Sequence, residues 1–450
     1  MELSQQQCQI AREARDARFD GRFFVAVKTT KIFCRPICPA NLPKEENVEY
    51  FQDVALALQA GYRPCLRCRP DSAPNSWAWR GVDTTFERAL KLIEQGELSQ
   101  NNMAEFAERL GITDRYLRQL FQSRLGMSPK QYALYHQLMF AKQLLHNSNM
   151  SIADIGFASG FNSTRRFNDA FQKMLQLTPS QVRKQGASTS PTQHIELSYK
   201  GNLAWQHMLD FYQLRAVNSL EQVAGDSYAR YVKLDQTSGW FRVTHMGKSK
   251  KLKLEFELDD ISQLKRLVKQ VRRMFDLDAD LEVIEKHLSN IEPALVVKTG
   301  IRIPGVWSAW EAGVRAILGQ QVSIKAAINQ LNLLVGTLQP QGITHFPTPK
   351  EVAVADLSFL KMPQSRKETL ACFAQLINQH PDATFDQWLD LKGIGPWTVN
   401  YAALRGLSEP DHFLIGDLVV KKALQQFPNL TAESVSPYGS YATFHCWSHA

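Results

Sequence analysis

The chain has 450 residues, of which 44% are hydrophobic and 21% charged, as in folded globular proteins, and its length suggests about three domains. Its formal net charge of +8, most of it carried by the N-terminal 190 residues, favours a polyanionic partner. No apolar run reaches the roughly 20 residues of a membrane-spanning helix, and the polar N-terminus lacks a signal-peptide core. We therefore expect a cytoplasmic protein with no membrane partner.

Residues 1–75 are predicted to form a small α+β domain that is held together by a metal. The segment RFFVAVKTT alternates like a strand, and DVALALQAGYRPCLRC has the pattern of a helix closed by Gly61. Four of the seven cysteines in the chain lie here, in a Cx3C and a Cx2C pair. Two close pairs with a longer spacer are typical of a tetrahedral Zn²⁺ site. The spacing alone favours a structural site for one zinc ion, with the ligands Cys34, Cys38, Cys65 and Cys68.

Sequence motifs around these cysteines indicate that the metal site has a chemical role as well as a structural one. The motifs TT-x-IFCRP-x-C, ENV-x-YF and A-x-AGYRPC-x-RC-x-PD resemble the N-terminal domain of the adaptive-response (Ada) protein family. This resemblance implies that a zinc thiolate takes a methyl group irreversibly from a DNA methylphosphotriester, with Cys34 as the acceptor. A thiolate is the nucleophilic form of cysteine, and an uncharged triester does not repel it. Pro39, Ala40 and Asn41 depart from the family, which carries basic residues there.

Methyl transfer would also change the charge of this site. Four thiolates around Zn²⁺ have a formal charge of −2, and methylation of one sulfur reduces it to −1. Repulsion between the site and the DNA backbone then falls, so the affinity for DNA should rise. The domain is therefore expected to act as a chemical switch as well as a repair centre.

Residues 83–185, which follow a Pro- and Ser-containing linker at 71–81, are predicted to be helical throughout. They contain two helix-turn-helix patterns, with turns at Gly111 and Gly160, joined by one long helix. A helix is expected to start near Thr113. The doubled pattern and the paired endings RLGMSPKQY and MLQLTPSQV resemble the AraC-type DNA-binding domain. The resemblance implies a transcription activator that binds promoter DNA, and we expect RNA polymerase as a further partner.

The second helix of each unit would face the major groove of DNA. Arg, Gln and Asn side chains read guanine and adenine edges, although individual residues could contact only phosphates or solvent. The predicted DNA-facing residues are Arg115, Arg118, Gln119, Ser163, Arg165, Arg166 and Asn168. The residues with the helical spacing of a core are Leu117, Leu120, Phe121, Phe167 and Phe171.

After a second linker at 185–193, the sequence predicts an α+β domain over 193–285 and an all-α domain over 286–450. The all-α domain contains LKGIGPWTVNYAAL (391–404), a helix-hairpin-helix pattern. Gly393 and Gly395 allow its tight turn, where backbone N–H groups can bind a DNA phosphate. This hairpin, the segment VWSAWEAGVRAILGQQVS and the segments LDFYQLRAVNSLEQV and MFDLDADL together resemble the AlkA-type alkylpurine DNA glycosylases.

This second resemblance implies that alkylated purines such as 3-methyladenine are flipped out of DNA and released by hydrolysis. Asp417 would be the catalytic carboxylate, although Ile415 and Gly416 stand where the family usually has Pro and Asp. Gln321 stands at the position of the wedge residue that enters the duplex; the alternative is an exposed loop glutamine. Trp397 occupies the position of the lysine nucleophile of bifunctional relatives, so lyase chemistry is not expected.

Aromatic residues are expected to stack on the flipped base. A cationic base is attracted to the electron-rich faces of these rings, by about 2 kcal/mol when the pair is desolvated. The alternative is that these rings belong to the hydrophobic core. The predicted pocket residues are Trp397, Tyr401, Trp447 and Phe211.

The sequence as a whole predicts a multidomain, mainly α-helical monomer whose partner is double-stranded DNA, both damaged DNA and promoter sites. One end would sense methylphosphotriesters and activate transcription, and the other would excise alkylated purines. The alternative is a zinc-dependent transcription regulator whose C-terminal half binds DNA without catalysis.

Overall fold

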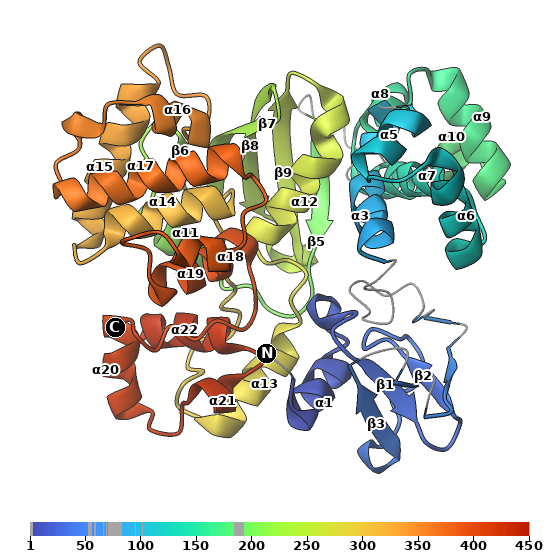
Figure 1. The fold of residues 1–450 in the computed structure, drawn as a ribbon, viewed down its shortest axis with the longest axis horizontal. Helices are drawn as coiled ribbons and strands as arrows, with labels where there is room; N and C mark the ends of the chain where they lie inside the picture. Colours follow the sequence, from blue (N-terminus) through green and yellow to red (C-terminus); the bar gives the residue numbers. More distant parts are fainter. Residues whose placement is uncertain are drawn as a thin grey trace. The chain divides into compact units, whose positions relative to one another are not determined.

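The computed structural model describes residues 3–52, 56–57, 60–65, 67–68, 70, 83–94, 96–100, 102–183 and 193–449 (Figure 1). The chain forms two compact units, Met1–Ser188 and Thr189–Ala450. Helices predominate, as the sequence predicts, and none within these ranges is long and apolar enough to cross a membrane. The two predicted linkers lie almost entirely outside the described residues.

The first unit begins with a small mixed sheet in the strand order β3-β1-β2-β4, in which only β2 and β4 run parallel. The predicted strand is present as β1, whereas the helix predicted before Gly61 lies largely outside the described residues. One apolar cluster of its described residues consists of Phe24, Ala26, Phe33, Ala57 and Tyr62, and a domain of this size buries little surface without further stabilisation. The elements are α1 (Gln5–Ala14), η1 (Ala17–Phe19), β1 (Phe24–Val27), β2 (Ile32–Cys34), η2 (Glu45–Asn47), β3 (Val48–Phe51) and β4 (Arg63–Pro64).

The rest of the first unit is helical and contains the two predicted helix-turn-helix units. Gly111 (φ +73°) and Gly160 (φ +86°) occupy the left-handed region at the two turns, which glycine adopts without steric cost. The Thr113 hydroxyl caps the helix that starts at the next residue, confirming the predicted start. The helices are α3 (Asp83–Glu94), α4 (Glu97–Gln100), α5 (Met103–Arg109), α6 (Asp114–Leu125), α7 (Pro129–Asn147), α8 (Ile152–Ala158), α9 (Thr164–Leu175) and α10 (Pro179–Val182).

The second unit opens with an antiparallel five-stranded sheet in the order β5-β9-β8-β7-β6. The sequence predicts β7, β8 and β9, whose longer runs alternate between buried and exposed residues. It does not predict the shorter strands β5 and β6, since four or five residues give little alternation. The elements are β5 (His194–Ser198), α11 (Trp205–Gln213), β6 (Glu221–Ala224), β7 (Ser227–Leu234), β8 (Thr237–His245), η5 (Gly247–Ser249), β9 (Lys251–Leu258), η6 (Ile261–Gln263) and α12 (Leu264–Met274).

The remaining helices of this unit pack around α14, which is buried on almost every side. Gly313 permits the close approach of α17, because a Cβ atom there would lie 2.6 Å from the Phe373 ring. The elements are α13 (Leu281–Ile291), α14 (Ala309–Gly319), α15 (Ile324–Leu338), α16 (Pro349–Val354), η7 (Leu357–Phe359), α17 (Gln364–Gln379), α18 (Phe385–Leu389), α19 (Pro396–Ala402), η8 (Ala403–Leu407), α20 (Leu418–Gln426), α21 (Ala432–Val435) and α22 (Gly439–Ser448).

A buried ionic network connects the sheet to α14. Arg230 on β7 binds Glu311 on α14 at 3.0 Å, and Arg315 binds Glu221 at 2.6 Å. Burial by itself would raise the pKa of Glu221, but Arg315 and Arg230 outweigh it and lower the pKa to about 2. The network therefore joins the sheet and the helices into a single folding unit at neutral pH.

We expect Arg230→Met to destabilise the second unit by about 3–5 kcal/mol, because it leaves buried Glu311 without one of its cations. Urea unfolding of the full chain, followed by tryptophan fluorescence, measures this loss. Glu221 contributes stability above its unfolded pKa near 4.5, and this contribution is lost as the pH falls towards 2. Arg266→Met, which breaks an exposed ion pair with Asp235, should lower the free energy of unfolding by less than about 1 kcal/mol. Equal losses of unfolding free energy in the Arg230→Met and Arg266→Met proteins would show that the buried network stabilises the fold no more than an exposed pair does.

Candidate functional site

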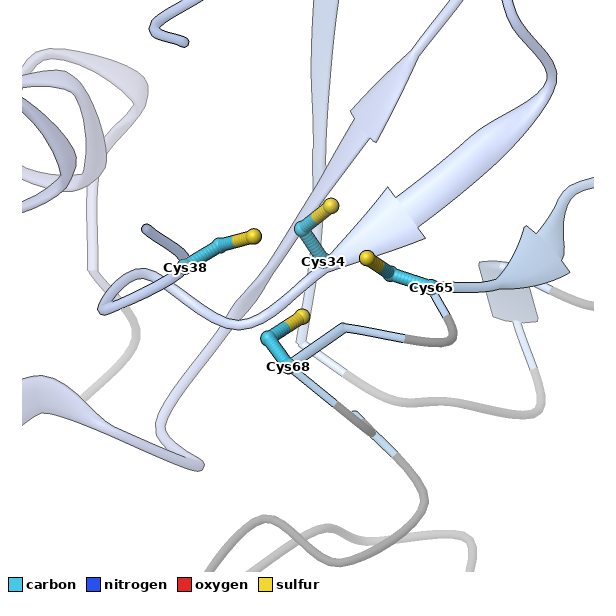
Figure 2. Close-up of side chains that lie close together, drawn as sticks. All are labelled: Cys34, Cys38, Cys65 and Cys68. Carbon is cyan, nitrogen blue, oxygen red and sulfur yellow. The ribbon is translucent and has the colours of Figure 1, made fainter. Parts of the chain in front are cut away.

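The four predicted zinc ligands converge beside the small sheet, with their sulfur atoms directed towards one another (Figure 2). All four Sγ atoms lie within 4.8 Å of one another. Sulfurs bound 2.3 Å from a tetrahedral zinc ion lie about 3.8 Å apart. The donor set therefore fits one Zn²⁺, held by Cys34, Cys38, Cys65 and Cys68.

Strand pairing brings the two cysteine pairs together. Cys34 ends β2, which pairs in parallel with β4, and Cys65 follows β4 directly. The N–H of Cys65 donates to the carbonyl of Phe33 at 2.9 Å. The N–H of Arg35 donates to Sγ of Cys68 at 3.3 Å, and its guanidinium donates to the Cys68 carbonyl, also at 3.3 Å. Strand pairing and the contacts of Arg35 therefore place Cys34, Cys65 and Cys68 beside one another.

Crowding makes these thiols difficult to ionise together. The hydrogen bond with Cys68 raises the pKa of Cys34 well above that of an ordinary thiol, and the same bond lowers the pKa of Cys68 to about 6. The negative charge of one thiolate thus opposes ionisation of the neighbouring thiols. A bound divalent cation such as Zn²⁺ would offset this repulsion and keep the cysteines as nucleophilic thiolates. Cys34 and Cys65 are half-buried, whereas Cys38 and Cys68 are 8% and 9% exposed. Cys34 is therefore one of the two ligands most accessible to a substrate.

Removing the metal is expected to unfold the small sheet domain while the second unit stays folded, because so small a domain depends on its metal for stability. Hydrogen exchange of the full chain, with and without a strong chelator, measures this as lost protection confined to residues 24–64. Cys68→Ser should give the same result without chelator, and Cys372→Ser, at an exposed cysteine of the second unit, should not. Unchanged protection after chelation would contradict a stabilising zinc site.

The predicted recognition residues are exposed on α6 and α9, with one exception. Ser163 caps α9: its hydroxyl accepts the N–H of Arg166 at 3.3 Å, so it has a structural role. Arg118 pairs with Asp114 through two hydrogen bonds of 2.7 and 2.8 Å and would have to share its guanidinium with DNA. The exposed residues are Arg115, Arg118, Gln119, Arg165, Arg166 and Asn168. The predicted core residues Leu117, Leu120, Phe121, Phe167 and Phe171 are at most 5% exposed, which confirms that prediction.

The two hairpin glycines have different roles. Gly393 has φ +90°, and a Cβ atom there would lie 2.2 Å from Oγ1 of Thr369, so only glycine fits. Gly395 is the N-cap of α19 with φ −113°, which any residue adopts, and a Cβ atom would meet nothing within 4 Å. Gly393 therefore allows the tight turn, as predicted, whereas the conformation of Gly395 does not depend on its being glycine. The open space at Gly395 leaves room for a phosphate to approach the backbone.

The predicted wedge residue lies in the loop between α14 and α15. Gln321 is exposed and has a left-handed backbone (φ +54°). Its neighbour Gln320 donates to the carbonyl of Gly393 at 2.9 Å and to Oγ1 of Thr398 at 3.3 Å. Gln320 therefore ties the loop to the hairpin, a role that sequence reasoning missed because the partners are more than 70 residues away.

Asp417 is the N-cap of α20, and its two carboxylate oxygens are unequal. Oδ1 accepts the N–H groups of Val419 (2.9 Å) and Val420 (3.2 Å) and the indole N–H of Trp447 (3.1 Å). Oδ2 has no hydrogen bond to another residue in the range 193–449. The fold thus holds one oxygen in place and leaves the other available for a reacting centre.

Other acidic residues close to Asp417 in sequence are engaged elsewhere or exposed. The Asp411 carboxylate accepts a hydrogen bond from the Ser436 hydroxyl at 2.5 Å, so Asp411 has a structural role. Glu409 binds His412 at 2.6 Å. Asp390 is exposed. Of these carboxylates, Asp417 combines one oxygen that accepts three N–H groups with one that has no hydrogen bond to another residue among residues 193–449.

The four predicted pocket residues form a connected group, here called the aromatic cluster: Trp397, Tyr401, Phe211 and Trp447. Trp397 stacks on Tyr401 (centroids 5.2 Å apart, 23° between planes), and Phe211 stacks on Trp447 (6.1 Å, 15°). Arg405 joins the two pairs, donating to the Tyr401 hydroxyl at 2.9 Å with its Cζ 4.7 Å from the Phe211 centroid. Phe211 is buried, as expected if its ring belongs to the hydrophobic core. The other three rings are half-buried.

Comparison with known proteins gives matches to all regions of the chain. Three family models match: the metal binding domain of Ada (residues 7–71), a helix-turn-helix domain (106–185) and the AlkA N-terminal domain (194–308). The chain is 32% identical to DNA-3-methyladenine glycosylase 2 of Escherichia coli K12, over 56% of this chain and 95% of that one. It is 33% identical to the bifunctional transcriptional activator/DNA repair enzyme Ada of the same strain, over 38% and 47%.

One relative matches over nearly the whole length. The "Probable bifunctional transcriptional activator/DNA repair enzyme AlkA" of Mycobacterium tuberculosis H37Rv is 33% identical over 98% of this chain and 96% of that one. The three matching domains occur here in the order that the sequence motifs predict. This chain therefore belongs to the family of bifunctional transcriptional activators and DNA repair enzymes of the AlkA type.

Proposed function

We propose that this protein accepts a methyl group from DNA methylphosphotriesters on Cys34, thereby becomes a transcription activator, and excises 3-methyladenine-type bases from DNA. The observation that carries the proposal is the presence of two reactive groups on one chain. One is an accessible cysteine in a four-thiol metal site. The other is a carboxylate with one uncommitted oxygen beside the aromatic cluster.

In the first reaction the Cys34 sulfur attacks the methyl carbon of the triester. The carbon–oxygen bond breaks, its electron pair stays on the phosphate oxygen, and a phosphodiester anion and a thioether result. The sulfur loses its negative charge, so the protein surface near it repels DNA less. Tighter DNA binding by the exposed residues of α6 and α9 at promoter sites would follow.

In the second reaction the damaged nucleotide leaves the duplex and its base enters the space beside the aromatic cluster. Gln321 fills the gap that the base leaves. The glycosidic bond breaks with both electrons moving to the base, so a cationic alkylpurine departs neutral. Oδ2 of Asp417 stabilises the positive charge on the sugar and accepts a proton from the water that adds to C1′.

Double-stranded DNA is the partner for both reactions, and activation also requires RNA polymerase. We propose that residues 193–285 and 286–450 work as one glycosylase, because the buried pair between Arg230 and Glu311 joins them. We expect a monomer, since each reaction uses residues of a single chain.

The experiment that tests the glycosylase is incubation of the purified chain with N-methylated DNA, followed by chromatography of the released bases. Free 3-methyladenine supports the proposal. If methyl transfer to the protein occurs but no base is released, the alternative of a zinc-dependent regulator with a non-catalytic C-terminal half is correct.

A further inference from the structure

An acidic side chain holds one of the predicted DNA-reading arginines in a fixed orientation. Arg118 donates from Nε to Oδ1 of Asp114 at 2.7 Å and from Nη2 to Oδ2 at 2.8 Å. These hydrogen bonds lower the pKa of Asp114 and raise the pKa of Arg118, so both groups are ionised at neutral pH. The carboxylate therefore occupies one edge of the guanidinium plane.

The pair lies on the exposed face of α6. Leu117, Leu120 and Phe121 are the buried residues of this helix, whereas the side chain of Arg118 is 58% exposed. Asp114 is the first residue of α6 and Arg118 is the fifth. In helix-turn-helix proteins the residues near the start of the second helix contact base edges. The pair is therefore placed where such contacts are made.

The donors that remain on Arg118 match one particular base. A guanidinium has five N–H groups in a fixed fork, and among residues 102–183 only the bonds from Nε and Nη2 to Asp114 engage it. One N–H on Nη1 and one on Nη2 remain, parallel to each other at the end of the side chain. In the major groove guanine presents two acceptors, N7 and O6, to such a fork. Adenine and cytosine present an amino donor there, and thymine presents a single acceptor.

The carboxylate also disfavours contacts that carry no sequence information. An arginine without a partner can turn towards the phosphates of the DNA backbone. Asp114 is repelled by those phosphates, so the pair as a whole favours the base edges. Because the side chain is ordered before DNA binds, less conformational entropy is lost on binding.

The acidic neighbour on α9 is arranged differently. Nε of Arg165 lies 4.0 Å from Oδ2 of Asp169, beyond hydrogen-bond distance, and the two side chains are 92% and 74% exposed. Asp169 therefore does not hold Arg165 in one orientation, and the two helix-turn-helix units differ in this respect.

We propose that Asp114 is a positioning residue that holds Arg118 in a guanine-reading orientation. The first helix-turn-helix unit then requires a guanine at one fixed base pair of its promoter site, whereas Arg165 in the second unit imposes no such requirement. This inference rests on the proposed binding of promoter DNA, and it identifies one base of the site together with the two side chains that select it.

The test selects bound sequences from duplexes with a randomised segment, using the full-length protein with and without prior incubation with methylphosphotriester DNA. Competition binding then compares the selected duplex with three others in which the guanine pair is replaced. The wild type should prefer guanine at one base pair by about tenfold. Arg118→Ala should abolish the preference at that base pair and at no other.

The Asp114→Asn variant should change specificity and affinity in opposite directions. The guanine preference should fall about threefold to tenfold, the effect expected when a long side chain loses its preorganisation. Binding to duplexes without the guanine should become tighter, because a negative charge near the phosphates is removed. A purely structural role for Asp114 would instead weaken binding to every duplex. Asp114→Glu, which keeps a carboxylate, should keep the guanine preference.

Asp169→Asn is the matched control. It removes the same charge from an exposed position of α9, so it should tighten binding to all duplexes and leave the base preferences unchanged. Circular dichroism of each variant establishes that its helices are folded.

The outcomes separate this inference from the proposed function. If Arg118→Ala keeps the guanine preference, Arg118 does not read that base and the inference is wrong. If Asp114→Asn keeps the preference, or weakens binding to all duplexes equally, the positioning role is wrong and promoter binding stands. If the wild type selects no sequence in either state, the proposed promoter binding itself is wrong.

Discussion

The Asp417→Asn variant is expected to release 3-methyladenine from methylated DNA about 10³-fold more slowly than the wild-type chain. The amide keeps an oxygen that can accept the N–H groups of Val419, Val420 and Trp447, so the start of α20 should stay folded. What is lost is the negative charge that stabilises the sugar and accepts the proton of the attacking water. Single-turnover kinetics on a methylated duplex measure the effect.

Asp390→Asn provides the control for this variant. Asp390 is exposed and lies in the same region of the sequence, so its loss should change the rate less than about twofold, as at an ordinary surface position. Both variants should bind undamaged DNA as the wild type does. An Asp417→Asn protein with near-normal base release would show that another group performs the chemistry.

The Cys34→Ser variant is expected to lose methyl acceptance completely while base excision continues at the wild-type rate. A serine hydroxyl stays protonated near neutral pH and is a poor nucleophile without a neighbouring base. The excision residues lie in the second unit, so they are unaffected. Transfer of radiolabelled methyl from phosphotriester-containing DNA to the protein measures the first activity, and chromatography of free bases measures the second.

Cys65→Ser is the matched variant, because Cys65 is the other half-buried ligand of the same site. Zinc content is measured for both proteins, so that loss of the metal can be separated from loss of the acceptor. Methyl found on Cys34 in the Cys65→Ser protein would support the assignment. A Cys34→Ser protein that still takes up methyl would show that a different ligand is the acceptor.

Features determined by neighbouring residues could be predicted from the sequence. The metal site follows from the spacing of its ligands, because two close pairs of cysteines with a longer spacer are typical of tetrahedral zinc sites. The helix-turn-helix units follow from glycine turns and from the hydroxyl that caps α6. The aromatic cluster is predicted by resemblance, and its members do contact one another.

Features that depend on contacts between distant segments could not be predicted. Arg405 lies about 100 residues from its acceptor Pro304, and nothing in the local pattern marks it as a buried cation. The anchoring of Gln320 on the hairpin and the unequal oxygens of Asp417 also depend on tertiary packing. The sequence predicts that Gly395 allows the turn together with Gly393, but its backbone is extended and does not depend on glycine.

A single chain is expected both to accept a methyl group from phosphotriesters on a cysteine and to remove damaged bases. A single incubation of the full-length protein with methylated double-stranded DNA tests it, with intact-protein mass, peptide mapping and analysis of free bases made on the same sample. We predict one added methyl group per chain, located on Cys34, together with free 3-methyladenine. An unmodified protein, a methyl group on another residue, or the absence of free base would show that the chain does not combine the two activities on these residues.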